Sequence, residues 1–454
     1  MKNILIVFSK DIIRRNIFDT NFWSEFKKYN KGNKITLLVE DEKVSFFKEK
    51  VSSDVMVEGF TRVPRTFYEK IVNFLVRTGV ESHSVVTYRM RAYSRNQASL
   101  ISTLVKGFIG KFLAPFAWYQ AFVRKLVLKI QTPKRIQEVF ENGDFSHVFA
   151  PSLIDNEFDV HVAVETKKRK INLIGMVRSW DNLNNHGLLA VIPDKFIFQN
   201  TWLVEAAKEF QNINTDILNK DVVGLPHYDA YKNPEKYLMS RDEFFKALGL
   251  DTSKKLIFLG GSDFYYSEDA LPGILNKAIE EGGIKDAAQV IFRPHPASLF
   301  TLEEYGLDEL GNVILDPTFV DKSKISFSDT ERFINLMHHS DVIINIASTL
   351  SIDAAVFNKP AICINFDSKN KKLSHWEKVH RLYDHFDHYE KLVATGGISL
   401  PESPDELIEI INKYFDNPLL NEEGRKIAVE TFVAAFDGFS GKRLAESVFK
   451  DICK

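Results

Sequence analysis

The sequence predicts an α/β protein with two doubly wound domains that face a cleft, each domain built on a mostly parallel sheet. Three observations indicate this fold class. The chain has 454 residues, which is about three times the length of an ordinary domain. Its hydrophobic fraction of 44% and its charged fraction of 26% are typical of globular proteins. Short β-branched runs alternate with helical stretches, which is the pattern of parallel α/β sheets.

The charge balance and the cysteine content exclude several classes of protein. The 59 Lys+Arg residues nearly balance the 61 Asp+Glu residues, whereas a nucleic-acid-binding protein usually carries a clear basic excess. The two cysteines, Cys363 and Cys453, cannot form a disulfide framework and belong to no CxxC motif, which fits a reducing compartment. The N-terminal apolar run is too short for the core of a signal peptide or for a membrane span. We therefore expect a cytoplasmic protein that does not bind nucleic acid.

Two sets of expected strands define the two domains. In the first domain we expect strands at Asn3–Phe8, Lys34–Val39, His147–Pro151, Ile171–Val177 and Lys195–Gln199. In the second domain we expect strands at Leu256–Gly260, Gln289–Arg293, Asn312–Leu315, Val342–Asn345 and Ala361–Asn365. A proline-containing turn and a polar stretch separate the two sets. We therefore place the first domain at 1–225, the second at 226–430 and a C-terminal helical segment at 431–454.

The first domain carries an expected basic helical insertion at about 65–138. From Ser82 to Gln137 the sequence has ten Lys or Arg residues and no Asp or Glu. Two lysines and a proline interrupt its apolar stretch Leu100–Val123, so a transmembrane helix is a poor interpretation. Helices with apolar faces and a cationic remainder can lie on an anionic membrane, here the inner face of the cell membrane. The alternative is that they pack on the first domain and steer an anionic ligand.

The clearest chemical motif follows the expected strand Val342–Asn345. Ser348 and Thr349 come directly after this strand, and a helix is expected from Leu350. Free backbone N–H groups and the helix dipole at such a position favour a phosphate or another anion. The alternative is that one of the hydroxyls only caps the helix.

Two further motifs follow neighbouring strands of the second domain. Arg293 is followed by Pro294, His295 and Pro296, and the two prolines stiffen the turn that presents the imidazole. A histidine there can donate a hydrogen bond to a phosphate. The third motif is the run Gly260-Gly261-Ser262, in which the glycines permit close backbone approach to a ligand. The run lacks both the G-x-G-x-x-G spacing and a Walker lysine.

A polar cluster in the first domain supplies the candidate catalytic base. Asp181 lies just after the expected strand Ile171–Val177, and we expect it to act as a general base. Asp11 and Asp155 occupy comparable positions after other strands. The alternative is that these side chains only bond their own backbone.

Metal binding is not expected. The histidines of the stretch 375–388 show no HExxH motif and no compact tetrahedral pattern.

Taken together, the second-domain motifs resemble the donor-binding domain of bacterial glycosyltransferases with the GT-B architecture, in which two Rossmann-like domains face each other. The His295-Pro296 and Ser348-Thr349 pairs are similar to motifs of bacterial sialyltransferases, polysialyltransferases and CDP-glycerol glycerophosphotransferases. This resemblance implies that a CMP or CDP leaving group binds there, with His295 on the donor phosphate and Ser348 and Thr349 holding it. The segment after Gly438 resembles the C-terminal helix that crosses back to the first domain in that architecture.

The resemblance also bears on the nucleotide. The helix after Ser348 lacks the glutamates by which many UDP-sugar retaining enzymes hold ribose, and Asp353 is the only acid nearby. This favours a cytidine nucleotide, with Asp353 added to the donor-binding residues. The acidic catalytic motif of the polysialyltransferases has no clear counterpart, so the resemblance does not assign the base.

The function expected from these observations is a glycosyltransferase of cell-surface polysaccharide biosynthesis, such as that of capsule or lipopolysaccharide. It would move a sugar from a nucleotide-sugar donor to a glycan or lipid-linked acceptor, with no other cofactor. A CDP-polyol phosphotransferase for glycerol or ribitol phosphate is the first alternative. A UDP-sugar 2-epimerase-like enzyme and a non-catalytic membrane-associated binding protein remain further alternatives.

Overall fold

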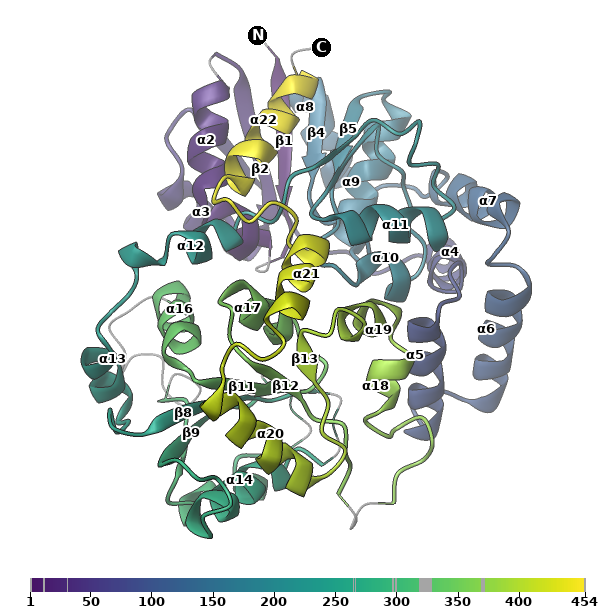
Figure 1. Ribbon diagram of the computed structural model, residues 1–454. Helices are drawn as coiled ribbons and strands as arrows, with labels where there is room; N and C mark the ends of the chain where they lie inside the picture. The colour runs from purple at the N-terminus through teal and green to yellow at the C-terminus, as the bar shows by residue number, and fades with distance from the viewer. Residues whose placement is uncertain are drawn as a thin grey trace. The chain divides into compact units, whose positions relative to one another are not determined.

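The computed structural model divides into two compact units (Figure 1). Unit 1 comprises Met1–Lys232 and Thr431–Lys454, and unit 2 comprises Asn233–Glu430. The structure describes residues 2–452 except 11, 12, 31, 264, 266, 296, 297, 299, 318–328 and 369–371. Each unit contains one parallel sheet with helices around it.

Unit 1 is built on a seven-stranded parallel sheet with the order β3-β2-β1-β4-β5-β6-β7. Its strands are β1 (Asn3–Phe8), β2 (Lys34–Glu40), β3 (Val55–Phe60), β4 (His147–Ala150), β5 (Asn172–Gly175), β6 (Lys195–Phe198) and β7 (Lys220–Val222). The chain winds from β1 to one edge, returns, and fills the other side from β4 outward. After one polar residue at the start, the central strands β1 and β4 are apolar, because helices cover both faces of such a sheet.

The helices of unit 1 follow these strands in the usual alternation. The shorter ones are α2 (Asn21–Tyr29), α3 (Val44–Lys50), α10 (Asn182–Asn185), α11 (Thr201–Glu209) and α12 (Tyr228–Lys232). The insertion and its neighbours form α4 (Phe67–Arg77), α5 (His83–Ser94), α6 (Leu100–Phe112), α7 (Ala117–Val127), α8 (Lys134–Gly143) and α9 (Glu157–Lys168). The last helix of the chain is α22 (Ser440–Ile452).

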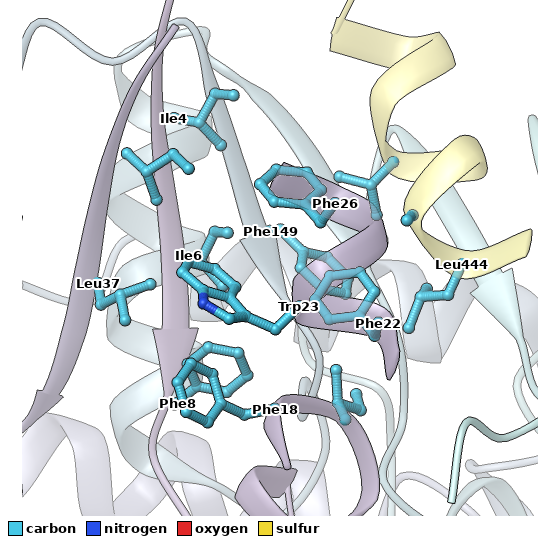
Figure 2. Close-up of a cluster of buried hydrophobic side chains, with 14 of the residues drawn as sticks. Ile4, Ile6, Phe8, Phe18, Phe22, Trp23, Phe26, Leu37, Phe149 and Leu444 are labelled. Atoms are coloured by element: carbon cyan, nitrogen blue, oxygen red, sulfur yellow. The ribbon is translucent and has the colours of Figure 1, made fainter. Parts of the chain in front are cut away.

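The C-terminal helix α22 completes the core of unit 1, as the resemblance implied. Leu444 of α22 packs with Phe22 and Phe26 of α2 and with Ile4 of β1 in one buried cluster (Figure 2). Asp229 fixes the start of α22, since its carboxylate accepts the backbone N–H groups of Ser440 at 2.9 Å and Gly441 at 2.8 Å. Burying an aromatic side chain such as Phe22 or Phe26 contributes about 2–3 kcal/mol to the stability of the fold.

Unit 2 is built on a six-stranded parallel sheet with the order β10-β9-β8-β11-β12-β13. Its strands are β8 (Lys255–Gly260), β9 (Ala288–Arg293), β10 (Val313–Leu315), β11 (Val342–Asn345), β12 (Ala361–Cys363) and β13 (Ile398–Ser399). Its helices are α13 (Arg241–Leu248), α14 (Ala270–Glu280), α16 (Asp329–His339), α17 (Leu350–Val356), α18 (Arg381–Asp384), α19 (Asp387–Val393) and α20 (Pro404–Asp416), and α21 (Glu422–Phe432) carries the chain on into unit 1.

Three strands, β3, β7 and β13, were not expected from the sequence. All three pair with only one neighbour, at an edge of a sheet. Edge strands are often short or only half apolar, so they give a weak periodic signal. β7 has the sequence Lys-Asp-Val, and β13 is two residues long.

Among the described residues, none of the helices is by itself long and apolar enough to cross a bilayer. Only α6 and α7 taken together have the required length and composition, and a 118° bend separates them.

Candidate functional site

The site expected in unit 2 lies where the direction of strand succession reverses. The chain runs from β8 through β9 to β10 on one side, and from β11 to β13 on the other. In open parallel sheets, ligands bind outside the carboxyl ends of the strands at this switch point. The segments there are Gly261–Ser262 after β8 and Ala347–Thr349 after β11.

The two glycines at the end of β8 allow close packing of three segments. The N–H of Gly261 donates to the carbonyl oxygen of Arg293 at 2.9 Å. A Cβ on Gly261 would lie 2.8 Å from the backbone nitrogen of His295 and 2.9 Å from the Cα of Pro294, and one on Gly260 would lie 2.7 Å from Leu350. The structure therefore brings Gly261 and His295 together, and the His295 side chain is exposed. Pro296 lies outside the described residues.

Ser348 belongs to a strained turn that precedes α17. Ala347 has a φ of +43°, which is uncommon for a residue other than glycine. The N–H of Ser348 donates to the side-chain oxygen of Asn345 at 3.2 Å, and its hydroxyl oxygen accepts the N–H of Leu350 at 3.2 Å. The hydroxyl oxygen thus bonds to the start of the helix, as the capping alternative expected. Thr349 is exposed.

A buried polar network holds this turn from below. Asn345, Ser351, Cys363 and Tyr389 are fully buried. The hydroxyls of Ser351 and Tyr389 are 2.8 Å apart, the amide of Asn345 donates to Ser351 at 3.0 Å, and Tyr389 donates to the carbonyl oxygen of Ser348 at 3.3 Å. Burial raises the pKa of Cys363 and of Tyr389, so the network is neutral. Satisfied buried networks of this kind fix one conformation.

Asp353 lies within α17 and is largely buried. Ser262 is also buried, and its backbone N–H donates to a carboxylate oxygen of Glu268.

Glu268 was not predicted from the sequence. Its carboxyl group is fully buried beside Gly261 and accepts hydrogen bonds from the N–H of Ser262 and the hydroxyl of Tyr305. Burial raises its pKa to about 7. The only signal in the sequence is an acidic pair, Glu268-Asp269, shortly after the glycines, and many surface loops show the same pattern.

Unit 1 has its own switch point, between β1 and β4. Lys10 follows β1, and Asp155 follows β4. Asp181 follows the next strand, β5. Two of the three predicted carboxylates therefore lie on adjacent strand ends, whereas Asp11 lies outside the described residues.

Asp155 is the centre of a charged cluster. It has a φ of +49°, and its carboxylate lies 2.6 Å from Arg77, 3.4 Å from Arg178 and 3.2 Å from the Nδ1 atom of His186. Burial raises the pKa of Asp155, but the hydrogen bond from His186 and the charges of Arg77 and Arg178 outweigh it and hold that pKa well below its usual range. Asp155 is thus a fixed negative charge.

Asp181 shares His186 with Asp155. Its carboxylate accepts the amide of Asn185 at 2.7 Å and lies 3.7 Å from the Nε2 atom of His186. The Asp181 side chain is 22% exposed, so it can reach a ligand. His186 was not predicted, although it stands only five residues after Asp181, because a single histidine in a polar loop carries no spacing signal.

A small cavity of about 60 Å³ adjoins this cluster. Asp155, His186, Glu69 and His161 contribute to its lining. A volume of this size holds a few water molecules.

Among the described residues, one group of side chains has a spacing compatible with a metal ion. The ligand atoms of Glu69, Glu157 and His161 lie within 4.8 Å of one another. Glu69 already bonds His161 at 2.6 Å and the backbone N–H of Thr66 at 2.7 Å. This pairing satisfies two of the three ligands without an ion.

Comparison with solved structures shows the fold. UDP-GlcNAc 2-epimerase from Neisseria meningitidis, bound to UDP-GlcNAc, is similar to 99% of this chain over 100% of its own, at a TM-score of 0.56 and 11% identity. A glycosyltransferase from Rickettsia africae is similar over 100% of this chain and 99% of its own, with a TM-score of 0.53 and 13% sequence identity. The chain has the GT-B fold. The wall teichoic acid polymerase TagF soaked with CDPG is similar over 99% of this chain and 89% of its own, with a TM-score of 0.50 and 11% sequence identity.

The predicted fold class is therefore confirmed, with two parallel sheets and a C-terminal helix that returns to unit 1. No protein-family model and no curated protein sequence matches the chain. The three similar structures are all named as enzymes, so the chain shares the fold of GT-B enzymes.

Proposed function

We propose that the protein is a glycosyltransferase that moves a sugar from a nucleotide-sugar donor to a glycan or lipid-linked acceptor in cell-surface polysaccharide biosynthesis. The observation that carries this proposal is the arrangement at the switch point of unit 2. Gly261 packs against the backbone of His295, while the Ser348 turn follows the neighbouring strand on the other side. The GT-B fold, shared with a glycosyltransferase, supports the same function.

The donor nucleotide is proposed to bind on unit 2. Gly260 and Gly261 let the end of β8 pack directly against Leu350 and the Pro294–His295 turn, because a Cβ on either glycine would collide with these segments. The exposed imidazole of His295 and the Ser348 and Thr349 hydroxyls supply hydrogen-bond donors for the donor phosphate. Arg293, at the end of β9, adds a positive charge.

A cytidine nucleotide is the preferred donor. The only acid in α17 is Asp353, which is largely buried, so this helix lacks the exposed glutamates by which many UDP-sugar retaining enzymes hold ribose. A neighbour in the same fold was soaked with CDPG.

The acceptor is proposed to bind on unit 1, where Asp181 acts as the general base. Asp181 would take the proton of the acceptor hydroxyl as its oxygen forms a bond to the anomeric carbon of the donor sugar. The bond from that carbon to the donor phosphate breaks, and the charge on the departing phosphate is stabilised by fixed donors such as His295. Asp155 and His186 would hold the orientation of Asp181. This order of events describes an inverting enzyme.

Two other reactions of the same fold are distinguished by their products. A CDP-polyol phosphotransferase transfers the phosphate together with the polyol and releases CMP. A 2-epimerase, the activity named for one structural neighbour, isomerises the sugar of its nucleotide without any acceptor.

The deciding experiment follows donor consumption with CMP-, CDP- and UDP-linked donors, with and without a mixture of glycan acceptors. A glycosyltransferase releases free nucleotide only when acceptor is present, and Asp181→Asn slows the release by about 10²–10⁴-fold. Formation of an isomerised sugar nucleotide without acceptor would contradict the proposal and indicate an epimerase. A product that carries the donor's phosphate would indicate the phosphotransferase.

A further inference from the structure

Helix α6 exposes a continuous apolar face. Its exposed large side chains are spaced three and four residues apart, which places them on one side of the helix: Leu100, Ile101, Leu104, Val105, Phe108 and Phe112. Their exposed fractions run from 45% for Val105 to 75% for Ile101. The rings of Phe108 and Phe112 pack on each other at 5.2 Å rather than on the protein interior.

The face continues onto α7. Phe116, Trp118 and Phe122 are each at least half exposed, and the rings of Phe116 and Trp118 stack at 6.3 Å. The opposite side of α7 is anchored in unit 1, where Tyr119 and Val123 are buried in a cluster with Val80 and Leu188. The exposed aromatic side chains are therefore held outward by a fixed helix. Exposed apolar patches of this extent mark interaction sites.

The basic residues of Ser82–Gln137 separate into two groups in the structure. Most arginines there are engaged within unit 1. Arg89 pairs with Glu81 at 2.7 Å and Arg135 with Glu58 at 2.6 Å. Arg124 donates to the carbonyl oxygens of Leu189 at 3.1 Å and Gln211 at 2.9 Å, and Arg91 is buried. These four arginines are thus bonded to groups of unit 1 or buried in it.

Four of the five lysines form the second group, and the fifth, Lys134 of α8, lies 3.9 Å from Glu138. Lys106 and Lys111 lie on α6, Lys125 lies on α7 and Lys129 follows it. Lys111, Lys125 and Lys129 are exposed and Lys106 is half-buried, and none of the four makes a salt bridge to another described residue. The available positive charge is thus concentrated on the two helices that expose the apolar side chains. No acidic residue occurs in this segment of the sequence.

We infer that this α6–α7 surface, defined by the nine apolar side chains named above and the four lysines, docks on an anionic lipid bilayer. Leu, Ile, Phe and Trp side chains would enter the boundary between headgroups and acyl chains, and the lysines would contact anionic headgroups. A second copy of the chain is a poorer partner, because pairing two such surfaces would bring like charges together. The inference goes beyond the proposed function, since it concerns where the protein binds and requires no donor.

The surface is narrower than the sequence alone suggested. The whole basic stretch Ser82–Gln137 was expected to contact either the membrane or an anionic ligand. In the structure, most arginines of this stretch are bonded or buried within unit 1. Within the stretch, exposed lysines and exposed large apolar side chains therefore occur together only on α6, on α7 and just after α7.

The test is flotation of the full-length protein with vesicles of phosphatidylcholine alone and of phosphatidylcholine mixed with phosphatidylglycerol. One variant removes apolar contact (Ile101→Ser, Phe108→Ser, Trp118→Ser, Phe122→Ser), and another removes charge (Lys106→Gln, Lys111→Gln, Lys125→Gln, Lys129→Gln). Matched controls are Ile217→Ser with Phe439→Ser, which are exposed apolar residues elsewhere on unit 1, and Lys48→Gln with Lys208→Gln, which are exposed lysines elsewhere on unit 1.

The inference predicts that the wild type binds vesicles containing phosphatidylglycerol and that raised salt weakens this binding. The affinity of both variants for these vesicles should be at least about tenfold lower than that of the wild type, whereas the controls should bind as the wild type does. Brominated lipids should quench a fluorescence component that Trp118→Phe lacks, which tests insertion even if a multiple variant folds poorly. Wild type that stays unbound, controls as weak as the variants, or a wild-type dimer that the apolar variant converts to monomer would each overturn the inference.

Discussion

The Nδ1 atom of His186 lies 3.2 Å from a carboxylate oxygen of Asp155, and its Nε2 atom lies 3.7 Å from one of Asp181. One imidazole therefore links the residues that follow two adjacent strands, β4 and β5. The imidazole is part of a charged cluster, because the Asp155 carboxylate also pairs with Arg77 and Arg178.

This relationship predicts a pH-dependent contribution to stability. Burial lowers the pKa of His186, but the hydrogen bonds and charges of Asp155 and Asp181 outweigh it and raise that pKa above its ordinary value. The stabilisation is then fully present below the unfolded-state pKa of about 6.5 and is lost as pH rises through the folded-state pKa. His186→Gln should lower the urea midpoint more at pH 5.5 than at pH 9. An equal loss at both values would show that the imidazole is not held as a cation.

Asp181→Asn tests the proposed base. The amide cannot accept a proton, and loss of a general base typically lowers the rate by about 10²–10⁴-fold. We expect kcat for sugar transfer to fall by this amount with little change in KM, and the thermal midpoint to stay near that of the wild type. Asp216→Asn, at an exposed position of the same unit, is the matched control and should keep full activity. A variant that retains wild-type kcat would remove Asp181 from the mechanism.

Gly261→Ala tests the close packing at the donor site. The added Cβ would meet backbone atoms of Pro294 and His295 at 2.9 and 2.8 Å, and a backbone contact cannot be relieved by a side-chain rotation. The His295 turn must shift, so donor affinity measured by calorimetry should fall at least about tenfold. Gly273→Ala is the control, because nothing lies within 4 Å of its Cβ and it sits inside α14. That change should stabilise the protein slightly and leave affinity intact.

Glu268→Gln tests the buried carboxyl group beside Ser262. Burial raises the pKa of Glu268 from 4.5 to about 7, so the folded state keeps a proton that the unfolded state loses between these values. Wild-type stability should therefore fall as pH rises across this window, by up to about 3 kcal/mol. The glutamine does not titrate. The free energy of unfolding of the variant, measured by urea denaturation, should therefore rise relative to that of the wild type from pH 4.5 to pH 8. Parallel pH profiles for the two proteins would contradict this account.

The fold could be predicted from the sequence more fully than the site. Central strands such as Val342–Asn345 and Asn3–Phe8 are buried on both faces, so an unbroken apolar run marks them. The edge strands β3, β7 and β13 have no such requirement and were missed. Residues after central strands, such as Asp181 and Ser348, could be selected because parallel topology places strand ends together.

The partners of those residues could not be selected in the same way. His186 and Glu268 are recruited by tertiary packing, and Arg77 reaches Asp155 across 78 positions of sequence. The exposed state of α6 also depends on which side chains the rest of unit 1 leaves uncovered. Composition shows that the segment is apolar and basic, but only the structure shows that Arg124 turns inward while Lys125 stays outside.

The most direct test of the proposed function is calorimetric titration of CMP, CDP, UDP, GDP and ADP into the wild type and into His295→Ala. The account predicts that a cytidine nucleotide binds the wild type most tightly and that its Kd rises at least about tenfold in the variant, since an imidazole contact to the phosphate is lost. Absence of binding by every nucleotide, or equal binding by both proteins, would contradict the placement of the donor at the switch point of unit 2.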